Sequence, residues 1–288
     1  MIKLEYDDKE FPYRLRNIIN PPKQLYVNGN KEILNNNLIA VVGSRANTEY
    51  GKKWCEKICM DLLKYNINIV SGMALGIDSI AHRTSILEGI PTVAVLPSGL
   101  NNIYPKNHLE LYNNIISEGG VVISEYEPNA NASSKNFIER NRIVAGLSIG
   151  VLVVEAAHRS GTSITARIAK EHGKNVFCVP GNLENSKSIG TNRLIQDGAI
   201  LVTSAEDIVN KYVFIHKIKT KRRARIKKEE IIDEQYKKIY DCIPEEGINI
   251  NDIANLNNLN LAEVIEAITV LEINGKIIRK AGNKYIRV

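Results

Sequence analysis

The chain has 288 residues, a hydrophobic content of 44% and a formal net charge of +6 at pH 7, which is enough for one large core and a small second domain. No stretch approaches the roughly 20 apolar residues that span a bilayer, and residues 1–10 carry charges where a secretory segment would be apolar. Composition therefore argues against membrane insertion and predicts a cytoplasmic protein.

The segment from residue 38 to about 210 alternates short apolar runs with helical patterns. The predicted strands are 38–42, 67–70, 92–96, 121–124, 149–154, 176–179 and 200–202, and the predicted helices are 50–65, 76–88, 135–147, 162–172 and 191–196. Such short, continuously apolar runs are typical of a parallel sheet that is buried on both faces. The repetition predicts a doubly wound α/β domain over residues 38–212, with residues 1–37 as a lead-in segment packed on it.

Glycine and serine turns follow several of the predicted strands. Gly43, Ser44 and Arg45 follow the first strand, and residues 71–76 and 97–99 follow the second and third. In doubly wound sheets, ligands bind outside the carboxyl ends of the strands, so these turns predict an anion-binding rim. Any single glycine of this set is explained as well by a tight turn alone.

The cysteines and the glycine turns argue against a metal or a cofactor. The cysteines are Cys55, Cys59, Cys178 and Cys242, and no pair has the two-residue spacing of a zinc knuckle or a redox motif. The turns lack both the dinucleotide fingerprint and the lysine of a triphosphate-binding loop. We therefore expect neither group.

A basic, aromatic and glycine-bearing cluster surrounds the predicted strand 149–154. The planar guanidinium of an arginine can bond two phosphate oxygens at once, and an aromatic ring can stack on a base. A glycine followed by hydroxyl residues at the start of a helix offers free backbone amides to an anion. The cluster therefore predicts single-stranded DNA binding. Its expected contacts are Lys135, Phe137, Arg140, Asn141 and Arg142 before the strand, Arg159, Ser160, Gly161 and Thr162 after it, and the turn of Gly43, Ser44 and Arg45.

Alternative roles remain open for several of these residues. Phe137 is explained equally by core packing, and Asn141 by tying down a turn. The rival function is a nucleotide hydrolase of the phosphoribohydrolase type, with Asp78, His82, Glu125 and Glu155 as the acid and base candidates. An ion pair between Asp78 and His82, with Glu155 holding a backbone turn or Arg140, is the preferred explanation of these groups, so a non-enzymatic protein is expected.

The end of the chain differs from the α/β segment in its charge and in its pattern of predicted elements. Eight bases and no acid lie between Lys217 and Lys228, and removing them leaves the rest of the chain at −2. This run predicts a basic linker over residues 213–231, which also suits an electrostatic DNA contact. Three helical patterns and a hairpin then predict a winged-helix domain over residues 232–288, whose third helix is too acidic for the major groove.

The turns and the cluster together resemble the DNA-processing protein A family, also called DprA or Smf. The matching segments are 43–45 with Tyr50 and Gly51, 71–78 with His82, 99–105, Ser124 with Glu125, 137–142, Glu155 with Ser160 and Gly161, and Pro180 with Gly181 followed by 190–199. They occur in the family's order over about residues 13–207.

This resemblance implies an extended Rossmann-like domain with a mostly parallel sheet that binds single-stranded DNA and forms homodimers. It implies protection of incoming DNA and loading of the RecA recombinase during natural transformation and recombination. Carried over by motif, Arg45, Lys106 and residues 137–142 line the DNA pocket, together with Lys135 and Arg159. We expect the cations at 45, 106, 140 and 142 to converge into one trough beside the ring of Phe137.

Overall fold

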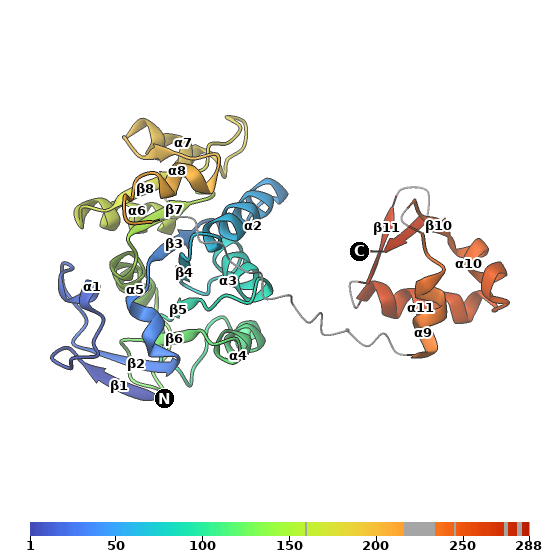
Figure 1. Cartoon of the computed structure of the whole chain (residues 1–288), viewed down its shortest axis with the longest axis horizontal. Coiled ribbons are helices and arrows are strands. Elements are labelled where there is room, and N and C mark those ends of the chain that lie inside the picture. Colours follow the sequence, from blue (N-terminus) through green and yellow to red (C-terminus); the bar gives the residue numbers. More distant parts are fainter. Residues whose placement is uncertain (159, 216–233, 245, 274–275, 281–283, 288) are drawn as a thin grey trace. The chain divides into compact units, whose positions relative to one another are not determined.

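The structure is a computed structural model that describes residues 1–158, 160–215, 234–244, 246–273, 276–280 and 284–287. These residues fall into two compact units, a larger one made of residues up to 215 and a smaller one made of residues from 234 onward (Figure 1). Arg159 and the predicted basic linker from residue 216 onward lie outside the described residues. No helix among the residues described is both long and apolar enough to traverse a lipid bilayer.

The larger unit is built on a nine-stranded sheet within the described part of the chain, with the order β1-β2-β6-β5-β4-β3-β7-β8-β9. The strands are β1 (Ile2–Glu5), β2 (Gln24–Gly29), β3 (Leu38–Val42), β4 (Asn68–Ser71), β5 (Val93–Val95), β6 (Val121–Ser124), β7 (Gly150–Val153), β8 (Asn175–Cys178) and β9 (Ile200–Leu201). All pairs from β6 to β9 are parallel, whereas β2 joins β6 and β1 in antiparallel fashion. The prediction of a doubly wound, mostly parallel, Rossmann-like sheet is confirmed.

Helices cover both faces of this sheet because alternate residues of each strand point to opposite sides. They are α1 (Tyr13–Arg16), α2 (Glu49–Leu63), α3 (Ile77–Leu87), α4 (Leu109–Ser117), α5 (Ser134–Leu147), α6 (Gly161–Glu171), α7 (Ile189–Gln196) and α8 (Ala205–Val209), with short 3-10 turns at Lys31–Asn35 and Lys106–His108. Leu38, Ala40 and Val42 of β3 join the core under α1, α5 and α6. Ile39 and Val41 join the core under α2, α3 and α8.

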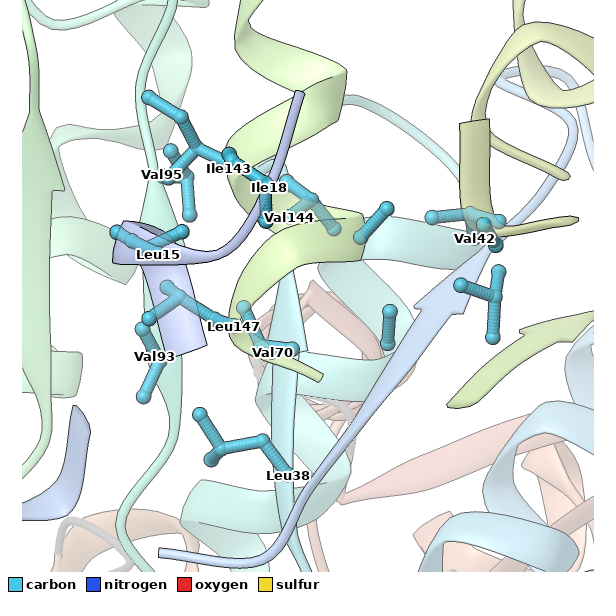
Figure 2. Packing of buried hydrophobic residues seen from close by; sticks show 14 of the residues in the cluster. Leu15, Ile18, Leu38, Val42, Val70, Val93, Val95, Ile143, Val144 and Leu147 are labelled. Atoms are coloured by element: carbon cyan, nitrogen blue, oxygen red, sulfur yellow. The ribbon is translucent and has the colours of Figure 1, made fainter. Parts of the chain in front are cut away.

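Figure 2 shows one side of this packing. Side chains from the α1 region and α5 pack against three neighbouring strands: Leu15, Ile18, Ile143, Val144 and Leu147 meet Leu38, Val42, Val70, Val93 and Val95. Gly146 of α5 allows this close approach, since a Cβ added there would lie 2.8 Å from a methyl carbon of Leu15. The lead-in segment is therefore part of the core, and it adds two antiparallel strands that local patterns did not predict.

The smaller unit contains α9 (Glu234–Asp241), β10 (Ile248–Asn249), α10 (Ile250–Asn257), α11 (Leu261–Ile273), β11 (Ile277–Lys280) and β12 (Lys284–Arg287). Its strands form a sheet with the order β10-β12-β11. Ile239, Ile253 and Val264 bring the three helices onto one small core. A left-handed residue, Asn258 (φ 51°), makes the tight turn between α10 and α11. The elements follow the predicted order, and the assignment to the winged-helix class remains a prediction.

His82 makes the stability of the larger unit depend on pH. It is fully buried on α3, and its Nδ1 lies 2.9 Å from the hydroxyl of Thr92. Burial, together with His108 and Arg140, lowers the pKa of His82 to about 3. Because an unfolded histidine has a pKa near 6.5, the stability that neutral His82 supports is complete above pH 6.5 and is lost as the pH falls toward 3.

A change from pH 7 to pH 5 is therefore expected to lower the unfolding free energy by about 2 kcal/mol more in the wild-type chain than in His82→Gln. Urea denaturation at the two pH values, followed by the fluorescence of Trp54, measures this difference. Trp54 is the only tryptophan in the sequence and lies in the larger unit. Equal losses in the two proteins would show that His82 does not couple protons to unfolding.

Candidate nucleic-acid interface

The predicted site lies where the strand order of the sheet reverses, between the neighbouring strands β3 and β7. The loops that follow these strands run in opposite directions, which leaves a crevice at the carboxyl edge in folds of this kind. The loop after β3 approaches α3 closely, because the amide of Ile77 donates to the carbonyl of Ser44 at 3.1 Å. Gly76, with φ +74°, permits this contact, since a Cβ there would lie 2.2 Å from that carbonyl oxygen.

Arg45, Tyr104 and Phe137 converge at this edge from three separate segments. The guanidinium carbon of Arg45 lies 4.9 Å from the centroid of the Phe137 ring. The Tyr104 ring meets the Phe137 ring edge to face, with centroids 5.4 Å apart. Arg45 and Tyr104 are exposed and Phe137 is half-buried. We call these three residues the aromatic platform. It offers a guanidinium stacked over one ring and a second, exposed ring at the edge of the first, which suits a phosphate and its base.

Arg45 keeps its charge available to a ligand, since within the described part of the chain it forms no ion pair. Lys106 is exposed and begins a 3-10 turn two residues after Tyr104. Lys135 is 81% exposed and lies two residues before Phe137, with Glu139 3.6 Å from its ammonium. The platform therefore has a cation of its own and flexible lysines in the segments that carry its two rings.

Arg140 does not join this surface, and its predicted place in the trough is wrong. Its side chain is buried, and Nη1 donates to the carbonyl of Gly72 at 2.6 Å and to the carbonyl of Val95. Gly72 must be glycine for this contact, because a Cβ there would lie 2.3 Å from Nη2 of Arg140. Asp78 accepts from the amide of Gly72 at 3.1 Å, so the carboxylate and the guanidinium both bond to the backbone of Gly72.

Burial is the largest cause of the pKa shifts of both Arg140 and Asp78. It lowers the pKa of Arg140 to about 10, against the opposing effect of Asp78. It also raises the pKa of Asp78, which Arg140 and two backbone amides oppose. Arg140 thus braces the ends of β4 and β5 from one helical turn below Phe137. Its contribution to the site is to position the platform.

Arg142 also departs from the predicted trough. Its Nη2 pairs with Oε2 of Glu125, and both side chains are largely buried, at 13% and 14% exposed. Burial raises the pKa of Glu125, and Arg142 opposes this shift. The guanidinium is therefore engaged by a carboxylate of the chain itself. Asn141 is half-buried and its side-chain oxygen accepts from Nε of the neighbouring Arg140 at 3.4 Å.

The start of α6 places the remaining predicted residues beside the first loop. The hydroxyl of Thr162 donates to the carbonyl of Gly43 at 3.2 Å, so it ties α6 to the end of β3. Gly161 is exposed, and a Cβ there would have nothing within 4 Å. Ser160 precedes the helix as its N-cap residue. These positions border the edge, but the Thr162 hydroxyl is already committed to the backbone.

The carboxylates proposed for a hydrolase are held by the fold. Glu155 is buried and accepts from the amide of Thr48 at 3.0 Å and from its hydroxyl, which fixes the start of α2. Gly51 makes room, because a Cβ there would lie 2.3 Å from the carboxylate. The expected ion pair between Asp78 and His82 is wrong, since Asp78 bonds Gly72 and His82 lies against Thr92.

Sequence reasoning left Tyr104 out of the expected contacts, although its ring completes the aromatic platform. The signals were its place in segment 99–105, one of those that resemble the family, and an aromatic residue followed by Pro105 and Lys106 in the loop after β5. No helix or strand periodicity marks such a loop position, so only the ring contact with Phe137 reveals its role.

The sequence matches the family described as DNA recombination-mediator protein A over residues 3–213. Protein Smf of Escherichia coli is 42% identical over 208 residues, which are 72% of this chain and 56% of the relative. DNA processing protein DprA of Streptococcus pneumoniae is 41% identical over 207 residues, which are 72% of this chain and 73% of the relative. The match to the E. coli relative thus spans little more than half of that protein's length.

Solved structures of DNA processing protein A are also similar to this chain. DNA processing protein A from S. pneumoniae superposes with a TM-score of 0.70 and 40% identity, over 74% of this chain and 75% of its own. The same-named protein from Helicobacter pylori, whose structure addresses its single-stranded DNA binding mode, superposes with a TM-score of 0.65 and 32% identity. That alignment covers 73% of this chain and 94% of the H. pylori chain.

Proposed function

Because the chain belongs to the DNA recombination-mediator protein A family, we propose that it binds single-stranded DNA through its larger unit. The observation that carries this proposal is the aromatic platform, where Arg45 lies over the ring of Phe137 and Tyr104 closes the cluster. A base stacks on an aromatic face whatever its identity, and a guanidinium holds the adjacent phosphate. Sequence-independent binding of an unpaired strand follows from this combination.

The residues proposed for the site divide into two groups. Arg45, Tyr104, Lys106, Lys135 and Phe137 contact the strand directly, and Gly43, Ser44, Asn141, Ser160 and Gly161 border it. Arg140, Arg142 and Thr162 act from within the fold, because their polar groups already bond to the chain. Arg159 is proposed as a contact from its sequence position alone.

The wider role proposed is the processing of incoming DNA in natural transformation and recombination, in the cytoplasm. In this role the protein forms a homodimer, protects the strand and loads the RecA recombinase, without catalysis of its own and without a cofactor. The proposal is supported by similarity to proteins named DNA processing protein DprA and Smf.

The smaller unit is proposed to act elsewhere than in the strand-binding site. The helix α11, which a winged helix would present to a major groove, carries exposed Glu263, Glu266 and Glu272. Carboxylates repel the phosphates on both sides of the groove. Strand binding is therefore assigned to the unit that carries the aromatic platform.

A salt-titrated comparison of oligo-dT with a duplex of the same length tests the proposed function. Stacking on the platform needs an unpaired base, so oligo-dT is expected to bind the full chain more tightly than the duplex at every salt concentration. The logarithm of its affinity should fall with the logarithm of salt by about 0.7 for each phosphate that the protein neutralises. Equal affinities for the two ligands would overturn the proposal.

A further inference from the structure

A stripe of aromatic and basic side chains runs along the exposed face of α2. Tyr50, Lys53, Trp54 and Lys57 follow the spacing i, i+3, i+4 and i+7, so they lie on one side of the helix. We propose that this stripe holds a second stretch of the DNA strand that the aromatic platform binds. It extends the path of the strand beyond the aromatic platform. This inference rests on the single-stranded DNA binding proposed above.

The contacts within the stripe keep its rings and charges in place. The Tyr50 and Trp54 rings have centroids 6.1 Å apart, and the ammonium of Lys57 lies 4.8 Å from the centroid of the Trp54 ring. The hydroxyl of Tyr50 donates to the carbonyl of Pro180 at 2.8 Å. Trp54 is half-buried and packs on the core beneath α2, which leaves part of its ring open on a fixed side chain. Little entropy is lost when a base stacks on such a ring.

The charges of the stripe favour a polyanion. Lys53 and Lys57 are exposed, and among the described residues neither forms an ion pair. Glu49 and Glu56 stand four residues before and three residues after Lys53, so they border the stripe on one side, but none of the ion pairs among the described residues joins them to it. The next residue on this face, Asp61, is paired with Lys64 at 2.5 Å. The stripe therefore ends near Lys57.

The stripe is continuous with the candidate interface along the chain. The helix α2 begins at Glu49, four residues after Arg45, and Tyr50 lies in its first turn. The distance along the axis from Tyr50 to Lys57 is roughly 10 Å at about 1.5 Å per residue. A strand that leaves Arg45 in this direction meets rings and ammonium groups in alternation, as single-strand binding surfaces require.

The single tryptophan provides a direct test on the full chain. Trp54 is the only tryptophan in the sequence, so a base stacked on it should quench nearly all of the tryptophan emission. We expect oligo-dT of about 20 nucleotides to quench the emission, whereas about 6 nucleotides occupy the platform without quenching. Binding of both lengths is followed independently by the anisotropy of a dye on the oligonucleotide.

Substitution of the lysines separates the stripe from the platform. Lys53→Ala/Lys57→Ala should weaken binding of the longer oligo-dT about tenfold and reduce its salt slope by about 1.4, because two phosphate contacts are lost. Its affinity for the short oligonucleotide should not change. Trp54→Phe keeps a ring at the same position and should bind the longer oligonucleotide nearly as well as the wild type.

The matched control is Lys170→Ala/Lys211→Ala. It removes the same charge away from α2, since Lys170 lies in the last turn of α6 and Lys211 precedes Tyr212. The control should bind like the wild type, and an equal loss in both double variants would overturn the inference. Tight binding of long oligo-dT without quenching would also overturn it while the proposed function stands. Failure of the wild type to bind either length would defeat both proposals.

Discussion

Replacing Arg45 with alanine is expected to weaken oligo-dT binding by about 2 to 3 kcal/mol, roughly 30- to 150-fold, because a charged contact to phosphate is lost. The same change removes the guanidinium from the Phe137 ring, whose centroid lies 4.9 Å from it. Arg45 follows a fully buried strand, so its backbone is held rigidly and little entropy opposes its contact. Anisotropy titrations over a series of salt concentrations measure the loss.

The conservative variant Arg45→Lys distinguishes charge from shape. Lysine keeps the positive charge but lacks the planar fork that bonds phosphate and stacks on a ring, so its affinity should fall between wild type and alanine. Unfolding free energies of both variants should stay within about 0.5 kcal/mol of wild type, because the side chain is exposed. Wild-type affinity in Arg45→Ala would remove the platform from the binding site.

Arg140→Ala is expected to act on stability first, lowering the unfolding free energy by about 3 to 5 kcal/mol. The substitution leaves the carbonyls of Gly72 and Val95 without their donor. It also leaves the buried carboxylate of Asp78 without the guanidinium that offsets its burial. Urea denaturation measures the loss, and DNA binding should fall with it because Phe137 stands one helical turn from this brace.

Two further variants test whether the buried pair causes this loss. Lys135→Ala lies on the same helix with an exposed side chain, and its unfolding free energy should stay close to wild type. Asp78→Asn/Arg140→Ala removes the uncompensated charge, so its loss should be smaller than the sum of the two single losses. A stability of Arg140→Ala equal to that of Lys135→Ala would refute the bracing role.

The buried and exposed arginines perform different tasks within one site. Arg140 donates to the carbonyls of Gly72 and Val95, and Arg142 pairs with Glu125. Arg45 alone of these three places its guanidinium over the ring of Phe137. The proposed DNA contact and the stability of the fold are therefore expected to be separable by mutation, since they are assigned to different residues.

The parallel strands and most helices of the larger unit were determined by sequence alone. The predicted limits of β3 and β6 coincide with the observed strands, because continuous apolar runs with little polar content must be buried on both faces. The helix α5 was predicted to within one residue for a similar reason, since its apolar positions recur with the period of a helix face. The turn of Gly43, Ser44 and Arg45 followed from where strands of this kind end.

Only the tertiary structure decided which cations face the solvent. Arg140 is buried because carbonyls 68 and 45 residues away in the chain meet its guanidinium, and no local pattern encodes those partners. The same holds for Arg142 with Glu125 and for the pairing of β2 with β6. Tyr104 joins Phe137 across the fold in the same way. Local hydrophobicity sets the elements, whereas burial and pairing of polar groups depend on neighbours that distant segments supply.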